Sequence, residues 1–583
     1  MVAIKELLKL NIENEIPLVI KAQDQSAEIA DRELSQYIVT RQIEELLERF
    51  LERYLTSSTD KIGVWISGFF GSGKSYFAKV LGYLLMNILL PGNIKARERF
   101  SERLASSQHR DFLNGRLDSL NKFPSQVVLF EIITEIGSGN ESIQQVMYKL
   151  LLKSQGFSRY PNIAVMENEM SDHGYYRGFK EYVFARGGDW EKVLENSGEF
   201  RHYAVDYLQS NFQFSHDAAI EFLKSAIEKY NNLSPSDFAF ACTRLAEIRK
   251  ERIIFIIDEM GQHLTSQENE DRLLQLQAIV EEFGSKGMGK LWLIITSQEK
   301  LDDLIANRNF DQKKLTKLND RFDVRLDLTS ENVDEVARQR LLTKKPEYIE
   351  LFENTYRNCT GNIQTLSDTE SIYPKTETVQ EFIDYYPFLK YQFQIIPDIV
   401  RSYTGITYAT ATERKFIFLV DSILKRLRNE QFGQIVTMVH IFDALGANFF
   451  GSGNVNFVNS VDSYYSSTTI KASDLLKVLL VLRPLTRIAS TEAVITKMLC
   501  PNLTQPIYQL QNEVHEMIEN LVNGKYVTRQ NGLINLVTPQ EKEFIVAMEK
   551  QTVSKPEMAT VQLSPSNGCM DPIISGEKGA VSL

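Results

Sequence analysis

Short, nearly continuous apolar runs recur through the first 330 residues and are separated by longer segments with helical periodicity. The runs cover residues 62–66, 126–133, 252–257, 290–295 and 323–328. Uninterrupted β-branched and apolar residues are typical of strands that helices bury on both faces, as in a parallel sheet. The pattern therefore predicts an α/β core with a parallel sheet over residues 56–330.

Helical periodicity dominates the segment before this core and one long segment inside it. Residues 1–55 are predicted to form an N-terminal helical arm, because residues 41–54 place apolar side chains at helical spacing and i,i+4 charge pairs on the other face. Residues from about 140 to 250 are mostly helical and rich in aromatic side chains. We interpret them as a helical insertion between two core strands, a kind of segment that more often contacts partners than carries chemistry.

The C-terminal half of the chain lacks the continuous apolar runs of the core. Residues 331–470 alternate helix and loop, which predicts a helical lid. Residues 471–550 place two helices before short strands around Asn531-Gly532, a hairpin turn signal, and this order suggests a winged-helix domain. Residues 551–583 have no periodicity and are rich in Ser, Pro, Gly and Thr, so a disordered tail is expected.

Composition narrows the class of protein. A chain of 583 residues exceeds one core, so three or four domains are expected. The net charge of −11 argues against non-specific coating of nucleic acid, although a local basic face, such as Lys525, Arg529 and Lys542 on the predicted winged helix, remains compatible with DNA contact. The four cysteines show no paired spacing, which indicates neither a zinc site nor a disulfide framework. The longest apolar stretch is interrupted by Lys79, so we expect a soluble, cytoplasmic protein with no membrane partner.

The strongest motif in the chain begins where the first apolar run ends. The pattern G-x-x-x-x-G-K-S is formed by Gly68, Phe69, Phe70, Gly71, Ser72, Gly73, Lys74 and Ser75. A strand leads in and a helix leads out, as a P-loop requires. Glycines let backbone N–H groups turn toward a triphosphate, Lys74 can reach the β- and γ-phosphates, and the Ser75 hydroxyl can bind Mg²⁺. The motif predicts a nucleotide site that uses ATP and Mg²⁺.

The apolar run at residues 252–257 ends in Asp258 and Glu259, which is the Walker B pattern. A central strand would bring Asp258 to the Mg²⁺ shell and Glu259 to the attacking water. The second acid favours hydrolysis of a nucleoside triphosphate over phosphoryl transfer to a small molecule. ATP is preferred to GTP because no guanine-reading N-K-x-D motif follows the core strands.

Two further residues are candidates because of their place relative to later strands. The run at 290–295 leads to Gln298, which we predict to sense the γ-phosphate or orient water, with Ser297 as the alternative and an ordinary strand cap as the competing reading. Arg321 stands just before the fifth run, where AAA+ ATPases place the arginine finger that reaches a neighbouring subunit; Arg325 is the alternative. A finger would make the active unit a homo-oligomer, whereas a simple ion pair would carry no such implication.

Several stretches resemble the large P-loop ATPases of BREX phage-defence systems, the BrxC/PglY family. They are residues 18–25 and 33–40, the loop at 68–75 with its double phenylalanine, residues 386–393 and the hairpin at 524–536. The resemblance covers about residues 15–550 and implies nucleotide and Mg²⁺ roles for Lys74, Ser75, Asp258 and Glu259, and a finger role for Arg321. Family members are usually about twice as long, so the resemblance implies a member without the C-terminal half, either truncated or naturally shortened at the unpatterned tail.

The sequence thus predicts an α/β fold with a P-loop, AAA+-like core, a helical insertion, a helical lid and a C-terminal winged-helix domain. The leading hypothesis is an ATPase that assembles or remodels a protein complex on DNA, which the resemblance implies is a bacterial phage-defence complex with other BREX proteins as partners. One alternative is an ATP-gated DNA-binding clamp, similar to origin-recognition proteins, with little turnover. Another is a signalling switch whose insertion recognises a protein trigger.

Overall fold

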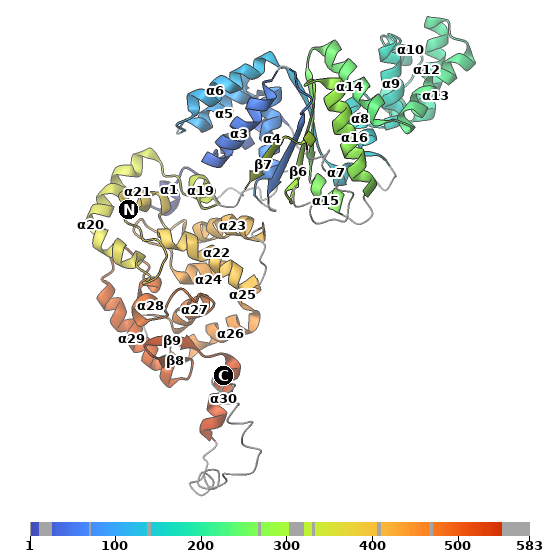
Figure 1. Cartoon of the computed structure of the whole chain (residues 1–583). Coiled ribbons are helices and arrows are strands. Elements are labelled where there is room, and N and C mark those ends of the chain that lie inside the picture. Colours follow the sequence, from blue (N-terminus) through green and yellow to red (C-terminus); the bar gives the residue numbers. More distant parts are fainter. Residues whose placement is uncertain are drawn as a thin grey trace. The chain divides into compact units, whose positions relative to one another are not determined.

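The computed structural model describes residues 2–10, 26–56, 58–68, 72–105, 107–136, 141–265, 270–301, 320–328, 333–404, 410–465 and 470–550 (Figure 1). The chain divides into two compact units. We call residues 14–340 with 408–417 the sheet unit, and residues 1–13, 341–407 and 418–583 the helical unit.

The sheet unit is built on five parallel strands in the order β4-β5-β6-β1-β7. The strands are β1 (Gly63–Gly68), β4 (Ser125–Glu131), β5 (Arg252–Asp258), β6 (Leu291–Ser297) and β7 (Val324–Leu328). Each coincides with one predicted apolar run, and the residues of β5 and β6 are all buried. Strand β1, which precedes the P-loop, lies between β6 and β7, and β5 and β6 separate it from β4. The predicted α/β core with a parallel sheet is confirmed.

Helices cover both faces of this sheet (Figure 1). One group contains α3 (Arg41–Tyr54), α4 (Lys74–Met86), α5 (Ala96–Ser101) and α6 (Arg110–Ser119), and the other contains α8 (Ile143–Ser154), α14 (Pro235–Arg249) and α16 (Glu270–Gly287). The mostly apolar α4 leaves β1 at the P-loop and packs against β4, β5 and β6. This placement fixes the start of α4 at the carboxyl edge of the sheet, where the acids of β5 also emerge.

The helical insertion is shorter than its predicted span of 140–250. Its members are α9 (Pro161–Asp172), α10 (Phe179–Ala185), α11 (Trp190–Val193), α12 (Ser197–Phe212) and α13 (His216–Asn231), and most of their buried side chains form a hydrophobic cluster separate from the main core. Helices α8 and α14 do not belong to it, because Val146, Met147, Phe238 and Cys242 pack in the core around the sheet. The insertion therefore covers residues 161–231.

The helices of the predicted N-terminal arm belong to two different units. Helices α2 (Ala27–Gln36) and α3 pack on the sheet unit, and Glu33 of α2 forms a buried ion pair with Lys79 of α4 at 2.9 Å. The short helix α1 (Ile4–Leu7) belongs to the helical unit, where backbone bridges join Ala3 to Gln431 and Leu8 to Lys344. The residues of the predicted arm, 1–55, are thus divided between the two units.

Most residues predicted to form the lid and the winged helix lie in the helical unit, whose second segment begins at residue 341. Its longer helices are α20 (Ile349–Ser367), α21 (Val379–Tyr385), α22 (Lys390–Thr404), α24 (Met438–Leu445), α26 (Ser452–Ser460), α27 (Ala472–Leu482), α28 (Glu492–Leu499), α29 (Ile507–Asn523) and α30 (Pro539–Lys550). Helix α23 (Thr410–Leu427) has its first residues in the sheet unit and the rest in the helical unit.

The predicted hairpin near the end of the helical unit is present. Strands β8 (Val527–Gln530) and β9 (Leu533–Leu536) pair antiparallel across Asn531 and Gly532. Both turn residues have positive φ, 51° and 79°, which is why Asn-Gly suits this two-residue connection. Helices α27, α28 and α29 precede the hairpin, the element order expected of a winged helix. Within the described residues, no helix has the length and apolar content needed to cross a membrane.

Candidate nucleotide-binding site

The P-loop segment connects the carboxyl end of β1 to the first residue of α4. Gly68 ends β1 beside Leu328 of β7, and a Cβ at Gly68 would lie 2.5 Å from the Leu328 carbonyl oxygen. Gly73 precedes α4 with φ of 86°, a left-handed conformation that glycine adopts without steric cost. Phe69, Phe70 and Gly71 lie outside the described residues. The two described glycines are thus explained by close backbone approach and by positive φ.

The start of α4 offers features that suit a phosphate group. Lys74 is its first residue and is 8% exposed, so its ammonium is held largely out of bulk water. The first backbone N–H groups of a helix have no intrahelical acceptor and carry partial positive charge. Ser72 adds a buried hydroxyl for which the described residues supply no hydrogen-bond partner. Together these groups have the charge and the hydrogen-bond donors that suit an anion at the carboxyl edge of the sheet.

Asp258 of β5 accepts hydrogen bonds from two other elements, α4 and β6. It ends β5 and is 6% exposed. The Ser75 hydroxyl, on α4, donates to its Oδ1 at 3.0 Å, and the Thr296 hydroxyl, on β6, donates to the same atom at 2.6 Å. The structure therefore brings together Ser75 and Asp258, which lie 183 positions apart in the sequence.

The Ser75 and Asp258 side chains fit a Mg²⁺ ion. Mg²⁺ in nucleotide sites takes oxygen ligands, commonly one or two protein groups together with phosphate and water. A hydroxyl and a carboxylate whose oxygens lie 3.0 Å apart beside an anion-binding helix end form such a donor set.

Glu259 follows Asp258 in a left-handed backbone conformation with φ of 58°. For a residue with a Cβ, this conformation costs roughly 1–2 kcal/mol and persists where surrounding contacts hold it. One such contact is the hydrogen bond from the Glu259 N–H to the Thr296 hydroxyl, at 2.9 Å. The chain then passes Ser297 so closely that a Cβ on Gly261 would lie 2.1 Å from the Ser297 Oγ.

The end of β6 contains a site residue that sequence reasoning missed. Gln298, the predicted sensor, is the first residue after β6 and is half-buried, while Ser297 is buried and accepts a hydrogen bond from the Glu299 N–H at 3.2 Å. Thr296 is the residue that hydrogen-bonds both to the Asp258 carboxylate and to the backbone N–H of Glu259, the residue that follows β5. Ile257 of β5 pairs with Ile295 of β6, so the next residues, Asp258 and Thr296, lie level on neighbouring strands. Aligning the ends of the two apolar runs in the sequence could therefore have identified Thr296. The role of Gln298 stays a prediction.

Arg321 lies at the opposite edge of the sheet from the P-loop. Its carbonyl oxygen lies beside Gly63, the first residue of β1, and its guanidinium pairs with Asp60 at 3.1 Å. The length of β7, about 13 Å at roughly 3.3 Å per residue, separates this end from the level of Gly68. Arg321 therefore cannot reach the P-loop of its own chain, and a finger role would have to act on another subunit. Arg325 lies within β7, half-buried.

Two of the three cations predicted to face DNA, Arg529 on β8 and Lys542 on α30, are engaged within the helical unit. Arg529 pairs with Glu492 at 3.2 Å and with Glu519 at 3.1 Å. The Lys542 ammonium lies 3.0 Å from the centroid of the Tyr526 ring, and burial lowers its pKa. These contacts leave Arg529 and Lys542 poorly placed for phosphate recognition.

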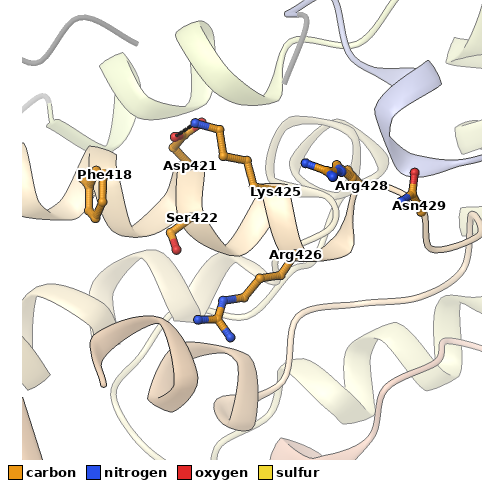
Figure 2. Close-up of a pocket in the computed structure, with 7 residues that line it drawn as sticks. All are labelled: Phe418, Asp421, Ser422, Lys425, Arg426, Arg428 and Asn429. Carbon is orange, nitrogen blue, oxygen red and sulfur yellow. Dashed lines mark ion pairs between the residues drawn. The ribbon is translucent and has the colours of Figure 1, made fainter. Parts of the chain in front are cut away.

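A hollow of about 450 Å³ runs along the second half of α23, and no residue of the predicted nucleotide site lines it (Figure 2). Lys425 is paired there with the buried Asp421 at 2.7 Å, and Arg426 donates to the Asp443 carbonyl oxygen at 3.0 Å. Figure 2 shows Lys425 and Arg426 pointing to different sides of the helix. Lys425 and Arg426 are thus each engaged by a different acidic residue of the helical unit, Lys425 by the Asp421 carboxylate and Arg426 by the Asp443 carbonyl oxygen.

No family model matches the chain. Among solved structures, it is similar to the Aeropyrum pernix ORC2 protein in ADPNP-ADP complexes, at 13% identity over 90% of this chain and 99% of that chain with a TM-score of 0.27. It is also similar to Drosophila ORC bound to DNA, at 11% identity over 92% and 95% with a TM-score of 0.29. A third is the A. pernix ORC1 protein in complex with DNA, at 11% identity over 92% and 100% with a TM-score of 0.28. The function proposed below rests on the chain's own residues and not on these likenesses.

Proposed function

We propose that this protein binds ATP with Mg²⁺ and hydrolyses it as an AAA+-like P-loop ATPase. The observation that carries the proposal is the convergence of Ser75, Asp258 and Thr296 beside the start of α4, with Glu259 directly after Asp258. A P-loop lysine, a hydroxyl, a metal-binding carboxylate and a second carboxylate are the groups that triphosphate hydrolysis requires. Strands β1, β5 and β6 and helix α4 carry these groups to the carboxyl ends of the parallel strands.

In this proposal each residue has one task. Lys74 and the first N–H groups of α4 bind the β- and γ-phosphates, and Ser75 and Asp258 hold the metal ion, which neutralises phosphate charge when bound. Glu259 polarises the attacking water, and Gln298 orients it or senses the γ-phosphate. Arg321 completes the site of a neighbouring subunit.

The test is Mg²⁺-dependent ATP hydrolysis by the wild type, Lys74→Ala and Glu259→Gln. We expect turnover in the wild type, loss of both binding and turnover in Lys74→Ala, and retained binding without turnover in Glu259→Gln. A Glu259→Gln protein with the wild-type rate would remove Glu259 from its assigned role. Tight ATP binding by the wild type without turnover would instead indicate the nucleotide-gated clamp or the switch.

We further propose that the activity serves a BREX-type phage-defence complex in the bacterial cytoplasm, where ATP drives assembly or remodelling on DNA. The support is the resemblance of the P-loop with its double phenylalanine and of the stretches at 18–25, 33–40, 386–393 and 524–536. Phage plating on cells that carry the complete defence system tests this role. Lys74→Ala should restore plaque formation, and unchanged protection by Lys74→Ala would contradict it.

DNA contact is tested separately with purified protein. Duplex DNA should stimulate hydrolysis, and binding should weaken as salt rises if phosphate contacts dominate. Because Arg529 and Lys542 are already engaged, replacing Arg529 with alanine should leave DNA binding nearly unchanged. A large loss of DNA binding in Arg529→Ala would show that Arg529 of the hairpin contacts DNA.

A further inference from the structure

Thr296 is the one described side chain that hydrogen-bonds both to the carboxylate of Asp258 and to the backbone of Glu259. It is fully buried on β6, and the strand register fixes it level with Asp258 on β5. A backbone N–H can only donate, so the Thr296 oxygen accepts from Glu259 and its single proton is given to Asp258 Oδ1. Both hydrogen bonds are therefore made at once, each in only one direction.

The first bond fixes the carboxylate of Asp258. Two hydroxyls, from Thr296 and Ser75, converge on Oδ1 at 2.6 and 3.0 Å, and this restricts rotation of the carboxylate about its last bond. If Ser75 turns to a bound metal ion, the bond from Thr296 is the one that still holds Asp258. Thr296 thus keeps this acid in place while its other hydroxyl partner changes role.

The second bond fixes the backbone from which the Glu259 side chain starts. Glu259 has φ of 58°, and its N–H is held by Thr296. Without that acceptor, a return to negative φ would rotate the Cα–Cβ direction of Glu259. A misplacement of about 1 Å in a catalytic group can cost about 100-fold in rate.

We propose that Thr296 is a positioning residue that couples the geometry of the two acids, setting the metal-binding carboxylate and the water-polarising carboxylate together. The inference rests on the proposed ATPase function. Thr296 acts through Asp258 and Glu259 and does not itself touch the nucleotide. A residue that only satisfied buried polar groups would affect folding but would not separate binding from turnover.

The experiment compares Thr296→Val, which keeps the shape and removes the hydroxyl, with Thr296→Ser, which keeps the hydroxyl. Thr496→Val is the matched control, because Thr496 is equally buried and its hydroxyl donates only to the Glu492 carbonyl of its own helix in the helical unit. Readouts are kcat, KM, the Kd of a fluorescent ATP analogue with and without Mg²⁺, and Tm. Thr296→Cys, with a thiol that is a weak donor, replaces Thr296→Val if the latter does not fold.

We expect kcat of Thr296→Val to fall about 10- to 100-fold while the Kd of the analogue changes by less than about threefold. Thr296→Ser should recover most of kcat, and Thr496→Val should keep the wild-type kcat.

Three results would overturn the inference. They are wild-type kcat in Thr296→Val, a Thr296→Ser protein as slow as Thr296→Val, or a loss of analogue affinity as large as the loss of kcat. Each of these presupposes turnover by the wild type. A wild type without turnover would overturn the proposed function and this inference with it.

Discussion

At the residue scale, the site depends on one residue with an unusual backbone conformation and on two glycines that have no room for a Cβ. Glu259 keeps a left-handed backbone that a hydroxyl from a neighbouring strand holds in place. Gly68 and Gly261 lie where a Cβ would meet Leu328 and Ser297 at 2.5 and 2.1 Å. The carboxyl edge of the sheet is thus packed closely around the start of α4, the proposed phosphate site.

Replacing Gly68 with alanine should displace the P-loop, since the new Cβ would overlap a backbone carbonyl that cannot rotate away. We expect a loss of about 1–3 kcal/mol in the free energy of unfolding together with loss of ATP binding. Gly115→Ala is the control, because Gly115 is exposed within α6 with open space around it, and alanine there should stabilise by about 0.5–1 kcal/mol. Urea unfolding and nucleotide titration measure both effects. Wild-type affinity in Gly68→Ala would contradict this account of the loop.

At the element scale, the packing of α2 on α4 depends on a buried ion pair. The Lys79 ammonium is 2.9 Å from one Glu33 carboxylate oxygen, and the Tyr83 hydroxyl donates to the other at 2.8 Å. Tyr76, next to Ser75, donates to the Glu33 carbonyl oxygen and meets the Tyr37 ring edge to face at 4.8 Å. The N-terminal helices are therefore attached to the helix that begins the phosphate site.

Lys79→Met should be strongly destabilising, because it leaves the Glu33 carboxylate buried without its cation. Removing one partner of a buried pair costs about 3–5 kcal/mol. The double variant Glu33→Gln with Lys79→Met should recover part of that loss. Glu45→Gln, which breaks an exposed pair with Arg41, should change the unfolding free energy by less than about 0.5 kcal/mol. Equal losses in the free energy of unfolding for Lys79→Met and Glu45→Gln would show that the buried pair stabilises the protein no more than the exposed pair does.

A second element-scale prediction concerns pH. Asp323, at the start of β7, is partly buried, which raises its pKa, but hydrogen bonds from Arg53 of α3 and from Lys61 outweigh burial and lower its pKa below the ordinary 3.8. A depressed carboxyl pKa gives stability that is present above pH 3.8 and is lost as pH falls through the folded-state pKa. Asp323→Asn should cost less than about 1 kcal/mol at neutral pH, since Asp323 and Arg53 are about one-third exposed and Lys61 is nearly half exposed. The difference from wild type in urea unfolding should shrink on acidification, and a difference that grows would contradict the assignment.

At the scale of the whole molecule, the position of Arg321 separates two kinds of active unit. Its place at the amino end of β7 excludes a role in its own P-loop. A catalytic role consequently requires at least two chains, with the site of one completed by the arginine of the next. An arginine that only pairs with Asp60 would leave a single chain sufficient for turnover.

Arg321→Ala should lower kcat without weakening ATP binding, and the specific activity of the wild type should rise with protein concentration. Asp60→Asn is the control, because it removes the ion pair and leaves the guanidinium in place. Mixing Arg321→Ala with Lys74→Ala subunits should restore part of the activity, since some sites then combine an intact P-loop with an intact Arg321. No recovery on mixing, with wild-type kcat in Arg321→Ala, would assign Arg321 to the ion pair alone.

The sequence by itself determined the five strands, their parallel α/β class, the P-loop, the two acids of β5 and the Asn-Gly hairpin. These features depend on local rules: continuous apolar runs, glycine conformations and a turn that favours positive φ. The tertiary structure decided what depends on register and on contacts distant in sequence. It placed Thr296 beside Asp258, Arg321 on the far edge from Lys74, and the hairpin cation Arg529 against its acids. The structure also shows that α8 and α14 pack in the main core and that α1 belongs to the helical unit. The sequence pattern shows which face of a helix is apolar, but only the tertiary structure shows which surface covers that face.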